Sequence, residues 1–531
     1  MSQLSFRNHS LSACSTLLAL LTGACGVGEE GSDRGTSSLA PFGSSPATTN
    51  NQQTTMTPNG AENAPAPAGT ADPAPAGDNN PETIPGAIAL TPSSTPGGTD
   101  MNGAIAAPGM QPNAPAMMPA AGTGTLERPT KGTANLFTDL LGVPVDQVDD
   151  KVQQAVNRFY GIGTNESTTP TRDTGYRVYY ELPQDRSLAF IWAADSNDVR
   201  SEGMSYGMMI AVQMNLQDQF NKLWKFAQTY MQFAANAGQT SWRGAFRWRG
   251  SVNSANPNNW QVNFNANTGP APDGDEYFAA ALYLADRRWG STGSVNYKQQ
   301  ADTISHALIS NPSANGNTPL FNAANNLVVF FPSGNSATFT DPSYNLPAFY
   351  ELFALDGPAG DAARWNTIAD ASRRLLVNAA DANTGLHPDY ANFNGTPNAG
   401  GPQFRYDAWR VIMNMAVDYA WFSQDPRFTT QANKYHAFFA NQLNANQDNV
   451  VNALFAVDGS NAAGGSSTAL TSTLGAGALA STAPNRNDFV RAAWSVNQQS
   501  GQYRYYQEAV YLLGLLSSAG LFGYDWDGNA P

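Results

Sequence analysis

Apolar residues recur three or four positions apart through most of the chain after about residue 126. Met204, Met208 and Val212 are one example, and this spacing is typical of a helix with a buried face. The pattern predicts about twelve helices, over residues 145–159, 202–215, 217–236, 274–288, 296–309, 344–355, 359–379, 405–423, 427–443, 467–481, 485–496 and 503–518. Loops rich in Gly, Asn and Pro join consecutive helices into pairs. Because each pair needs a partner to cover its apolar stripe, six pairs can close into a ring of inner and outer helices. We therefore predict an all-α barrel, with an open helical array as the alternative.

The composition changes at about residue 125. Residues 26–125 consist mainly of Pro, Ala, Gly, Thr and Asn with few aliphatic residues, so this segment cannot bury enough apolar surface to fold. We predict a disordered tether here, followed by one folded domain over residues 126–531. A coil of about 100 residues spans on the order of 55 Å.

The first 25 residues resemble the signal peptide of a bacterial lipoprotein. The apolar run over 17–21 is long enough for a signal core and too short to cross a bilayer. It ends in Leu-Thr-Gly-Ala-Cys, which is similar to a lipobox, although Thr22 stands where an aliphatic residue is usual. We predict lipidation of Cys25, attachment at the bacterial outer membrane or cell surface, and no other membrane contact. Ordinary signal cleavage with secretion is the alternative.

Charge and cysteine content narrow the possible functions. The net charge of -14 argues against a nucleic-acid partner, because binding phosphates needs a basic face. Both cysteines, Cys14 and Cys25, precede the folded domain, which therefore has no disulfide and no thiol chemistry. Charged residues make up 13% of the chain, against about 25% in a typical protein. Each carboxylate in the domain is therefore worth examining as a functional group.

The first candidate carboxylate is Glu202, in the first turn of the helix predicted over 202–215. Ser201 is a suitable N-cap, Gly203 leaves space, and Tyr206 offers a hydrogen bond. A glutamate in this place can simply complement the helix dipole, which is worth roughly 0.3–1 kcal/mol. A general acid would instead need apolar surroundings that raise the pKa of Glu202 against the pull of the dipole.

Two further acidic clusters begin later helices. Asp273 or Asp275 can cap the helix predicted over 274–288, but with Glu276 the segment holds more acids than a cap requires. Asp341 opens an Asp-Pro-Ser-Tyr segment that is typical of a helix start and brings Tyr344 to the same end of the barrel. Tyr344 either orients a water or a sugar hydroxyl or is an ordinary core residue.

The fourth cluster contains Asp407. This residue lies between Arg405 and Arg410, so we expect its carboxylate to be ionised at neutral pH. An ionised aspartate facing a protonated glutamate is the arrangement that glycoside hydrolysis requires. A purely structural ion pair between Asp407 and Arg410 is the alternative.

Aromatic residues in the polar loops are candidates for stacking on sugar rings. Burial in the core is the alternative for each of them. They are Trp192, Trp242, Phe246, Trp248 and Trp260.

Taken in order, the four acidic segments resemble glycoside hydrolase family 8, and most closely its xylan-active branch. The resemblance covers roughly residues 130 to 525. It implies the proton donor at Glu202, a substrate-binding acid at Asp273, the tyrosine near the catalytic water at Tyr344 and the catalytic base at Asp407. It also implies an (α/α)6 barrel, inversion of configuration, and no metal or other cofactor.

The same resemblance implies xylan or a xylo-oligosaccharide as the substrate of a monomeric enzyme. We expect Asp341, Arg410 and Tyr206 to bind this substrate together with Asp273 and Tyr344. Cellulose, mixed-linkage glucan and chitosan are alternative substrates. A catalytically inactive, glycan-binding lipoprotein on the same barrel is an alternative from another class of function.

The sequence bears on whether the enzyme cleaves at the end of a chain or within it. Members that release xylose from the reducing end carry a Leu-His-Pro kink late in the chain, which closes the substrate cleft. The corresponding region here, residues 458–465, has no such insertion, and the Leu-His-Pro over 386–388 comes too early. We therefore favour an open cleft and cleavage within long chains, with exo action as the alternative.

Overall fold

The computed structural model describes residues 125–234, 240–265 and 268–526. The predicted leader with Cys25, and nearly all of the predicted tether, lie outside the described residues. Within the part that is described, no helix is long and apolar enough to cross a membrane.

Six helices form a closed inner ring. They are α3 (Ser201–Gln213), α5 (Pro272–Trp289), α7 (Pro347–Asp356), α9 (Val411–Asp418), α11 (Thr468–Ala476) and α13 (Arg504–Ser518). Each helix packs against the next, and α13 packs back against α3. Most side chains of these helices are buried on every face of the helix, as expected for helices that are surrounded by other segments. The predicted (α/α)6 barrel is confirmed, and the open array is excluded.

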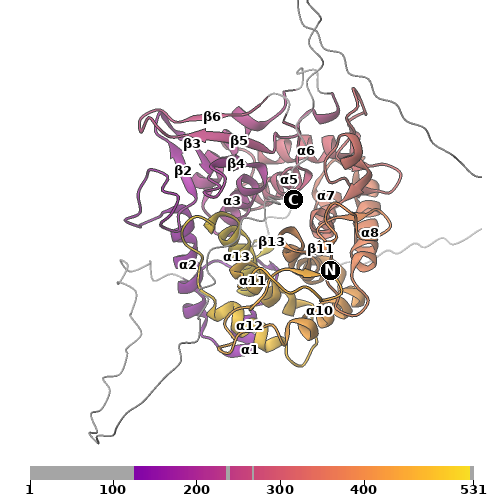
Figure 1. The fold of residues 1–531 in the computed structure, drawn as a ribbon. Helices are drawn as coiled ribbons and strands as arrows, with labels where there is room; N and C mark the ends of the chain where they lie inside the picture. Colours follow the sequence, from indigo (N-terminus) through magenta and orange to yellow (C-terminus); the bar gives the residue numbers. More distant parts are fainter. Residues whose placement is uncertain (1–124, 235–239, 266–267, 527–531) are drawn as a thin grey trace, which may run out of the picture. The chain divides into compact units, whose positions relative to one another are not determined.

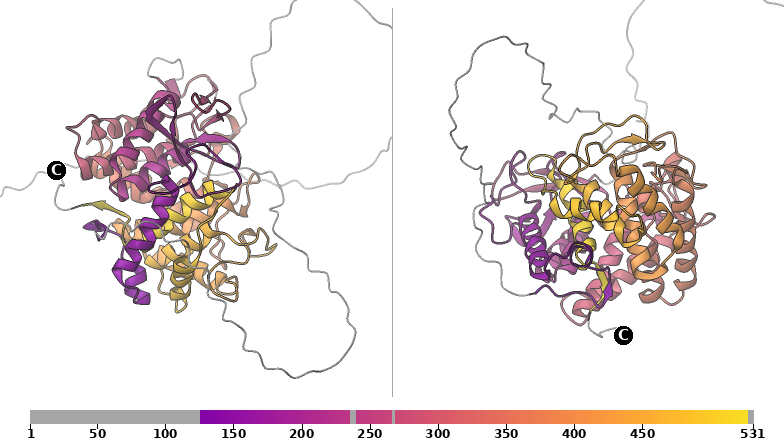
Figure 2. Two further views of the ribbon diagram at one scale, coloured as in Figure 1. Left: turned by 90° about the vertical axis from the view of Figure 1, so that its left-hand side faces the viewer. Right: turned by 90° about the horizontal axis from the view of Figure 1, so that it is seen from below.

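A second layer of helices surrounds this ring (Figure 1). It comprises α2 (Val145–Tyr160), α4 (Gln217–Phe226), α6 (Tyr297–Ser310), α8 (Ala362–Ala379), α10 (Pro426–Phe439) and α12 (Arg486–Ser495). In α2 the buried Val148, Val152, Val156 and Phe159 recur every three or four residues, so one stripe faces the ring. Figure 2 shows α2, in indigo, beside the yellow α13, which comes last in the sequence.

Several predicted helices are divided into helical segments of different pitch. The helix predicted over 217–236 is α4 followed by the π-helical η1 (Ala227–Met231). The helix predicted over 405–423 consists of the 3-10 helix η5 (Tyr406–Arg410), then α9, then the π-helical η6 (Tyr419–Ser423). Such changes of pitch reorient the side chains of the affected turn. Further short segments are α1 (Leu136–Leu141), which was not predicted, η2 (Thr240–Trp242), η3 (Gly334–Thr338), η4 (Pro342–Tyr344) and η7 (Gly477–Leu479).

Short antiparallel strands, which the helical pattern did not predict, connect the helices at the barrel ends. A hairpin is formed by β2 (Tyr179–Leu182) and β3 (Asp185–Ile191), and a three-stranded sheet by β4 (Asp198–Arg200), β5 (Arg249–Asn253) and β6 (Gln261–Asn263). The remaining pairs are β1 (Lys131–Gly132) with β13 (Gly523–Asp525), β7 (Phe321–Asn322) with β8 (Leu327–Val328), β9 (Phe339–Thr340) with β10 (Ala391–Asn392), and β11 (Gln403–Phe404) with β12 (Phe455–Ala456).

Most of the aromatic residues that were candidates for stacking on sugars are buried in the fold. Trp260, for example, packs edge-on against Tyr180 of β2 and Phe190 of β3. The alternative of burial in the core therefore holds for four of the five residues, and among these five only Trp248 is partly exposed. The four buried residues are Trp192, Trp242, Phe246 and Trp260.

The two ends of the barrel differ in chemistry. The N-terminal ends of the inner helices carry the acidic clusters, as the next subsection describes. The C-terminal ends are covered by the chain around β13. There Gln213 of α3 donates to the Gly523 carbonyl at 2.9 Å, and the Trp421 indole donates to the Phe522 carbonyl at 3.2 Å. All candidate chemistry therefore lies at one end of the ring.

Candidate active site

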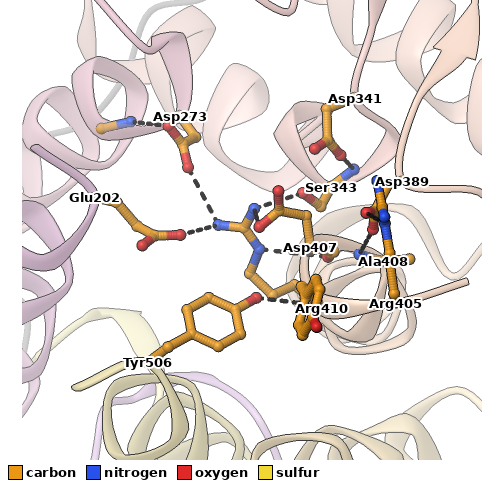
Figure 3. A network of polar contacts seen from close by, with 12 residues as sticks. Glu202, Asp273, Asp341, Ser343, Asp389, Arg405, Asp407, Ala408, Arg410 and Tyr506 are labelled. Atoms are coloured by element: carbon orange, nitrogen blue, oxygen red, sulfur yellow. Dashed lines mark hydrogen bonds and ion pairs between the residues drawn. The ribbon is translucent and has the colours of Figure 1, made fainter. Parts of the chain in front are cut away.

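Carboxyl groups from three inner-helix segments converge on one guanidinium, that of Arg410 (Figure 3). Arg410 Nη1 donates to Glu202 Oε1 at 3.1 Å and to Asp273 Oδ2 at 3.2 Å, and Nη2 donates to Asp407 Oδ1 at 2.9 Å. Glu202 begins α3, Asp273 begins α5, and Asp407 lies in η5 just before α9. The structure thus brings together three residues that lie in three separate clusters of the sequence.

The position of these acids follows from how the inner helices begin. Each acid lies in the first turn, where unpaired backbone N–H groups and the helix dipole favour negative charge. The predicted caps are wrong, however. Ser201 is the first residue of α3 rather than its cap, and α5 has no side-chain cap. Instead Asp273 accepts from the amide of the next residue, Gly274, at 2.8 Å, and the buried Asp275 accepts from the Phe246 amide of a neighbouring segment at 2.9 Å.

Solvent access separates two of the acids from the third. The side chains of Glu202 and Asp407 are 15% and 14% exposed, whereas that of Asp273 is 4% exposed and that of Arg410 is 2% exposed. Glu202 and Asp407 are therefore the two members of the cluster best able to reach a substrate and a water molecule.

Glu202 and Asp407 are also close enough to act on one bond. Because both accept hydrogen bonds from the same planar guanidinium, Glu202 Oε1 and Asp407 Oδ1 are at most about 8 Å apart. Inverting glycosidases place their two carboxyl groups about 6.5–9.5 Å apart, and retaining ones about 5–5.5 Å apart. The pair can thus flank a single glycosidic bond.

The surroundings favour the protonated form of Glu202. Burial raises the pKa of the Glu202 carboxyl above its usual value, and the nearby Asp407 raises it further, while Arg410 opposes both. Burial also raises the pKa of Asp273, to about 7. Dipole complementation alone would lower the pKa of Glu202, so the environment fits a general acid better than it fits the structural alternative.

The segment around η4 supports Arg410 from the other side. Asp341 accepts from the Ser343 amide at 2.7 Å and so begins η4, and Ser343 Oγ accepts from Arg410 Nη2 at 2.8 Å. The ring of Tyr344 lies 5.8 Å from the Arg410 guanidinium and keeps a small exposed surface.

Asp341 and Tyr206 were expected to bind substrate, but neither has any exposed surface. The hydroxyl of Tyr206 instead accepts a hydrogen bond from Arg410. Both residues therefore organise Arg410 and η4 from below the surface of the site.

Two functional contacts were missed by the sequence analysis. Arg405, expected beside Asp407, donates from Nε to Asp389 Oδ2 at 2.5 Å instead. Tyr505 donates to Glu202 Oε2 at 3.0 Å from the first turn of α13. Asp389 lies in a loop without any distinguishing pattern. Tyr505 could have been found, because it occupies the same early position in its helix as the acids of α3 and α5.

The backbone next to Asp407 is also unusual. Tyr406 has a φ of 23°, a conformation that bulky residues avoid. The hydroxyl of Tyr506 donates to the Tyr406 carbonyl at 2.8 Å and holds this turn against α13. Strain of this kind persists only where surrounding contacts enforce it.

The described residues contain no group of three or more His, Cys, Asp or Glu side chains arranged to hold a metal ion. The centre of the acidic cluster is occupied by the Arg410 guanidinium, which supplies the positive charge there. The carboxyl groups around Arg410 can exchange protons with a substrate and with water.

Two close carboxyl groups, one with a raised pKa, at the end of a closed helical barrel are the arrangement that a glycoside hydrolase requires. The sequence profile of Glycosyl hydrolases family 8 matches residues 191–520, and the chain belongs to this family.

Relatives of known function agree with this assignment. The chain is 34% identical to the reducing-end xylose-releasing exo-oligoxylanase Rex8A of Paenibacillus barcinonensis, over 73% of this chain and 95% of that protein. It is similar to the crystal structure of a family 8 xylobiose complex from Teredinibacter turnerae, with 37% identity and a TM-score of 0.65 over 74% of this chain and 98% of that one. It is also 33% identical to Endoglucanase A of Acetivibrio thermocellus, over 47% of each protein.

Proposed function

We propose that this enzyme cleaves β-1,4-xylosidic bonds in xylan or xylo-oligosaccharides with inversion of configuration. Glu202 acts as the general acid and Asp407 as the general base. The observation that carries the proposal is the arrangement around Arg410. Two accessible carboxyl groups share one guanidinium, and burial raises the pKa of Glu202.

The proposed reaction uses each group once. Glu202 gives its proton to the glycosidic oxygen as the bond from that oxygen to the anomeric carbon breaks. Asp407 takes a proton from a water molecule that attacks the same carbon from the opposite face. Tyr344 lies beside Arg410 and is proposed to orient this water, and Asp273 is proposed to bind a sugar hydroxyl. Arg410 keeps both carboxyl groups in place.

The stereochemical course of the reaction tests this mechanism directly. Proton NMR of freshly cleaved xylo-oligosaccharide should show the α-anomer of the new reducing end before mutarotation. The β-anomer as the first product would indicate retention and overturn the assignment of Asp407 as the base.

The choice of xylan rests on the relatives. Relatives aligned over nearly three quarters of this chain and nearly all of their own length are named as xylose-releasing or solved with xylobiose, whereas Endoglucanase C of Ruminiclostridium cellulolyticum is 27% identical over 66% of this chain and 68% of its own. Xylan, cellulose, mixed-linkage glucan and chitosan should be compared by the release of reducing sugar. Fastest release from a polymer other than xylan would change the substrate. Binding without release from any of them would favour the inactive glycan-binding alternative.

We further propose that the enzyme cuts within long chains. Residues 458–465 are mostly exposed and include three glycines with positive φ, at 459, 464 and 465, so this segment is a surface loop. A family 8 xylanase from Teredinibacter turnerae, 36% identical, was solved as a catalytic mutant with xylohexaose. The viscosity of a xylan solution should therefore fall faster than reducing ends accumulate. Xylose as the sole early product would show exo action.

Finally, we propose that the enzyme works as a monomer held at the bacterial surface by a lipid on Cys25. Labelling with radioactive palmitate should mark the full-length chain, and Cys25→Ala should abolish the label. Label retained in that variant would exclude Cys25 as the attachment site. Light scattering of the unlipidated domain should give the mass of one chain.

A further inference from the structure

The general acid has a hydrogen-bond partner from the last helix of the ring. Tyr505 of α13 donates from its hydroxyl to Glu202 Oε2 at 3.0 Å, although the two residues are 303 positions apart in the sequence. Tyr505 is only 1% exposed, and burial raises the pKa of its phenol well above 10. The hydroxyl therefore keeps its proton across the working pH range and acts as a donor to Glu202.

The position of this hydroxyl is fixed by its neighbours. A Cβ atom at Gly203 would overlap the Tyr505 ring and lie 2.7 Å from its hydroxyl oxygen, so only glycine leaves room for Tyr505 beside the acid. The guanidinium of Arg200, the residue before α3, lies 5.6 Å from the centre of the Tyr505 ring. Tyr505 is thus enclosed by the same turn that carries Glu202.

The other oxygen of Glu202, Oε1, accepts a hydrogen bond that can be given up more easily. Oε1 accepts from Arg410 Nη1, which also faces Asp273 Oδ2 and the Tyr206 hydroxyl. This nitrogen carries two protons for three acceptors. Its contact with Oε1 can therefore be given up while its other partners remain.

We propose that Tyr505 is a positioning residue that makes Oε1 the proton-delivering oxygen of Glu202. This inference rests on the proposed role of Glu202 as the general acid. Tyr505 holds Oε2 as an acceptor, so the acidic proton resides on Oε1. As the Oε1–H bond breaks and the proton passes to the glycosidic oxygen, Glu202 becomes a carboxylate. The Tyr505 O–H bond stays intact, and its hydrogen bond strengthens because the acceptor is now charged.

The test compares two substrates that differ in their need for a proton. Xylotriose needs protonation of its leaving oxygen, whereas β-xylobiosyl fluoride releases an ion that needs little help. Tyr505→Phe should lower kcat on xylotriose by about 10- to 100-fold, the effect of losing a hydrogen bond to a charged group. On the fluoride the loss should stay below about two-fold. In the wild type the hydrogen bond from Tyr505 lowers the pKa of Glu202. Its loss in Tyr505→Phe should raise that pKa and move the alkaline limb of kcat/KM to higher pH.

Two further variants keep the result interpretable. Tyr160→Phe removes another buried tyrosine hydroxyl, one that donates to the Gly207 carbonyl of the same helix, and should leave both substrates unaffected. Gly203→Ala keeps the Tyr505 hydroxyl but displaces it, and should reproduce the selective loss on xylotriose. Thermal melts of all three variants measure folding separately.

Specific outcomes would overturn the inference. Equal losses on both substrates for Tyr505→Phe would show a structural role, and no loss on either would show no role. The proposed function fails in a different way. If Glu202→Gln kept its activity on xylotriose, Glu202 would not be the general acid, whatever Tyr505→Phe does.

Discussion

Replacing Arg410 with methionine removes the cation that three buried or half-buried carboxyl groups share. In the wild type its nitrogens lie 3.1 Å from Glu202, 3.2 Å from Asp273 and 2.9 Å from Asp407. Removing one partner of a buried ion pair typically costs about 3–5 kcal/mol, because the other charge is left without compensation. We expect Arg410→Met to lose stability of this order at neutral pH and to lose nearly all activity.

The pH dependence of this loss identifies its cause. Burial already raises the pKa of Glu202 and brings that of Asp273 to about 7, and Arg410 opposes both increases. Without Arg410 these pKa values rise further above those of the unfolded chain. When folding raises the pKa of a carboxyl group, the folded protein loses stability as the pH rises from the unfolded pKa of that group to its folded pKa. The deficit of Arg410→Met should therefore be largest at high pH and shrink as the acids become protonated.

Thermal melts at about pH 5 and about pH 8 measure this difference. A loss of about 4 kcal/mol in a domain of about 400 residues corresponds to a lower Tm by about 5 °C, expected at the higher pH. Arg504→Met is the matched control. Arg504 is fully buried and donates to four backbone carbonyls, and it opposes the raised pKa of one buried acid, Glu508, only weakly, so its deficit should change much less with pH than that of Arg410→Met. An Arg410→Met deficit that is equal at both pH values would refute this electrostatic account.

Three other predictions follow from the same structure. Glu202→Gln and Asp407→Asn should each lower kcat on xylo-oligosaccharide by at least about 10²- to 10⁴-fold with little change in Tm, and unchanged kcat in either would give that residue a structural role. The buried His387 and His436 have their pKa values lowered by burial from 6.5 to about 4. The unfolded chain therefore takes up protons first as pH falls below 6.5, and each histidine removes about 1.4 kcal/mol of stability per pH unit down to about pH 4. The stability of His436→Gln relative to wild type should rise by this amount over that range, and a constant difference would contradict it. Tyr506→Phe frees the strained turn at Tyr406 and should lower kcat with a smaller effect on KM, which initial rates on xylotriose would measure.

Much of the barrel could be predicted because its helices carry a local pattern. The stripe Val148, Val152 and Val156 is visible in the sequence, and it faces the ring in the structure. The strands could not be predicted in this way. The hairpin of β2 and β3 is stabilised by contacts between Tyr180, Phe190 and the distant Trp260. Such contacts depend on how loops return to the barrel, so the loop aromatics look exposed in the sequence and are buried in the fold.

In the candidate site too, residues with a local pattern could be predicted, and residues brought together by distant segments could not. The acids were found because each stands in a polar cluster at a helix start. The ion pair of Asp407 with Arg410, considered as a structural alternative, is present in the fold. The partner of Arg405 was missed, since Asp389 is brought to it by a loop. Tyr505 was missed because it stands outside any polar cluster, although it holds the same early position in its helix as Glu202 and Asp273. Its role depends on ring closure, which places the last helix beside the first.

The pairing of β1 with β13 fixes where the folded chain begins in relation to its chemistry. Lys131 pairs with Asp525, and the neighbouring residues cover the C-terminal ends of the inner helices, whereas every acid of the cluster lies at the N-terminal ends. A support or fusion partner attached ahead of residue 131 would therefore meet the domain on its inert end. Immobilisation through the N-terminal side should leave the acidic cluster accessible to substrate, while an attachment in the loop before η5 would obstruct it.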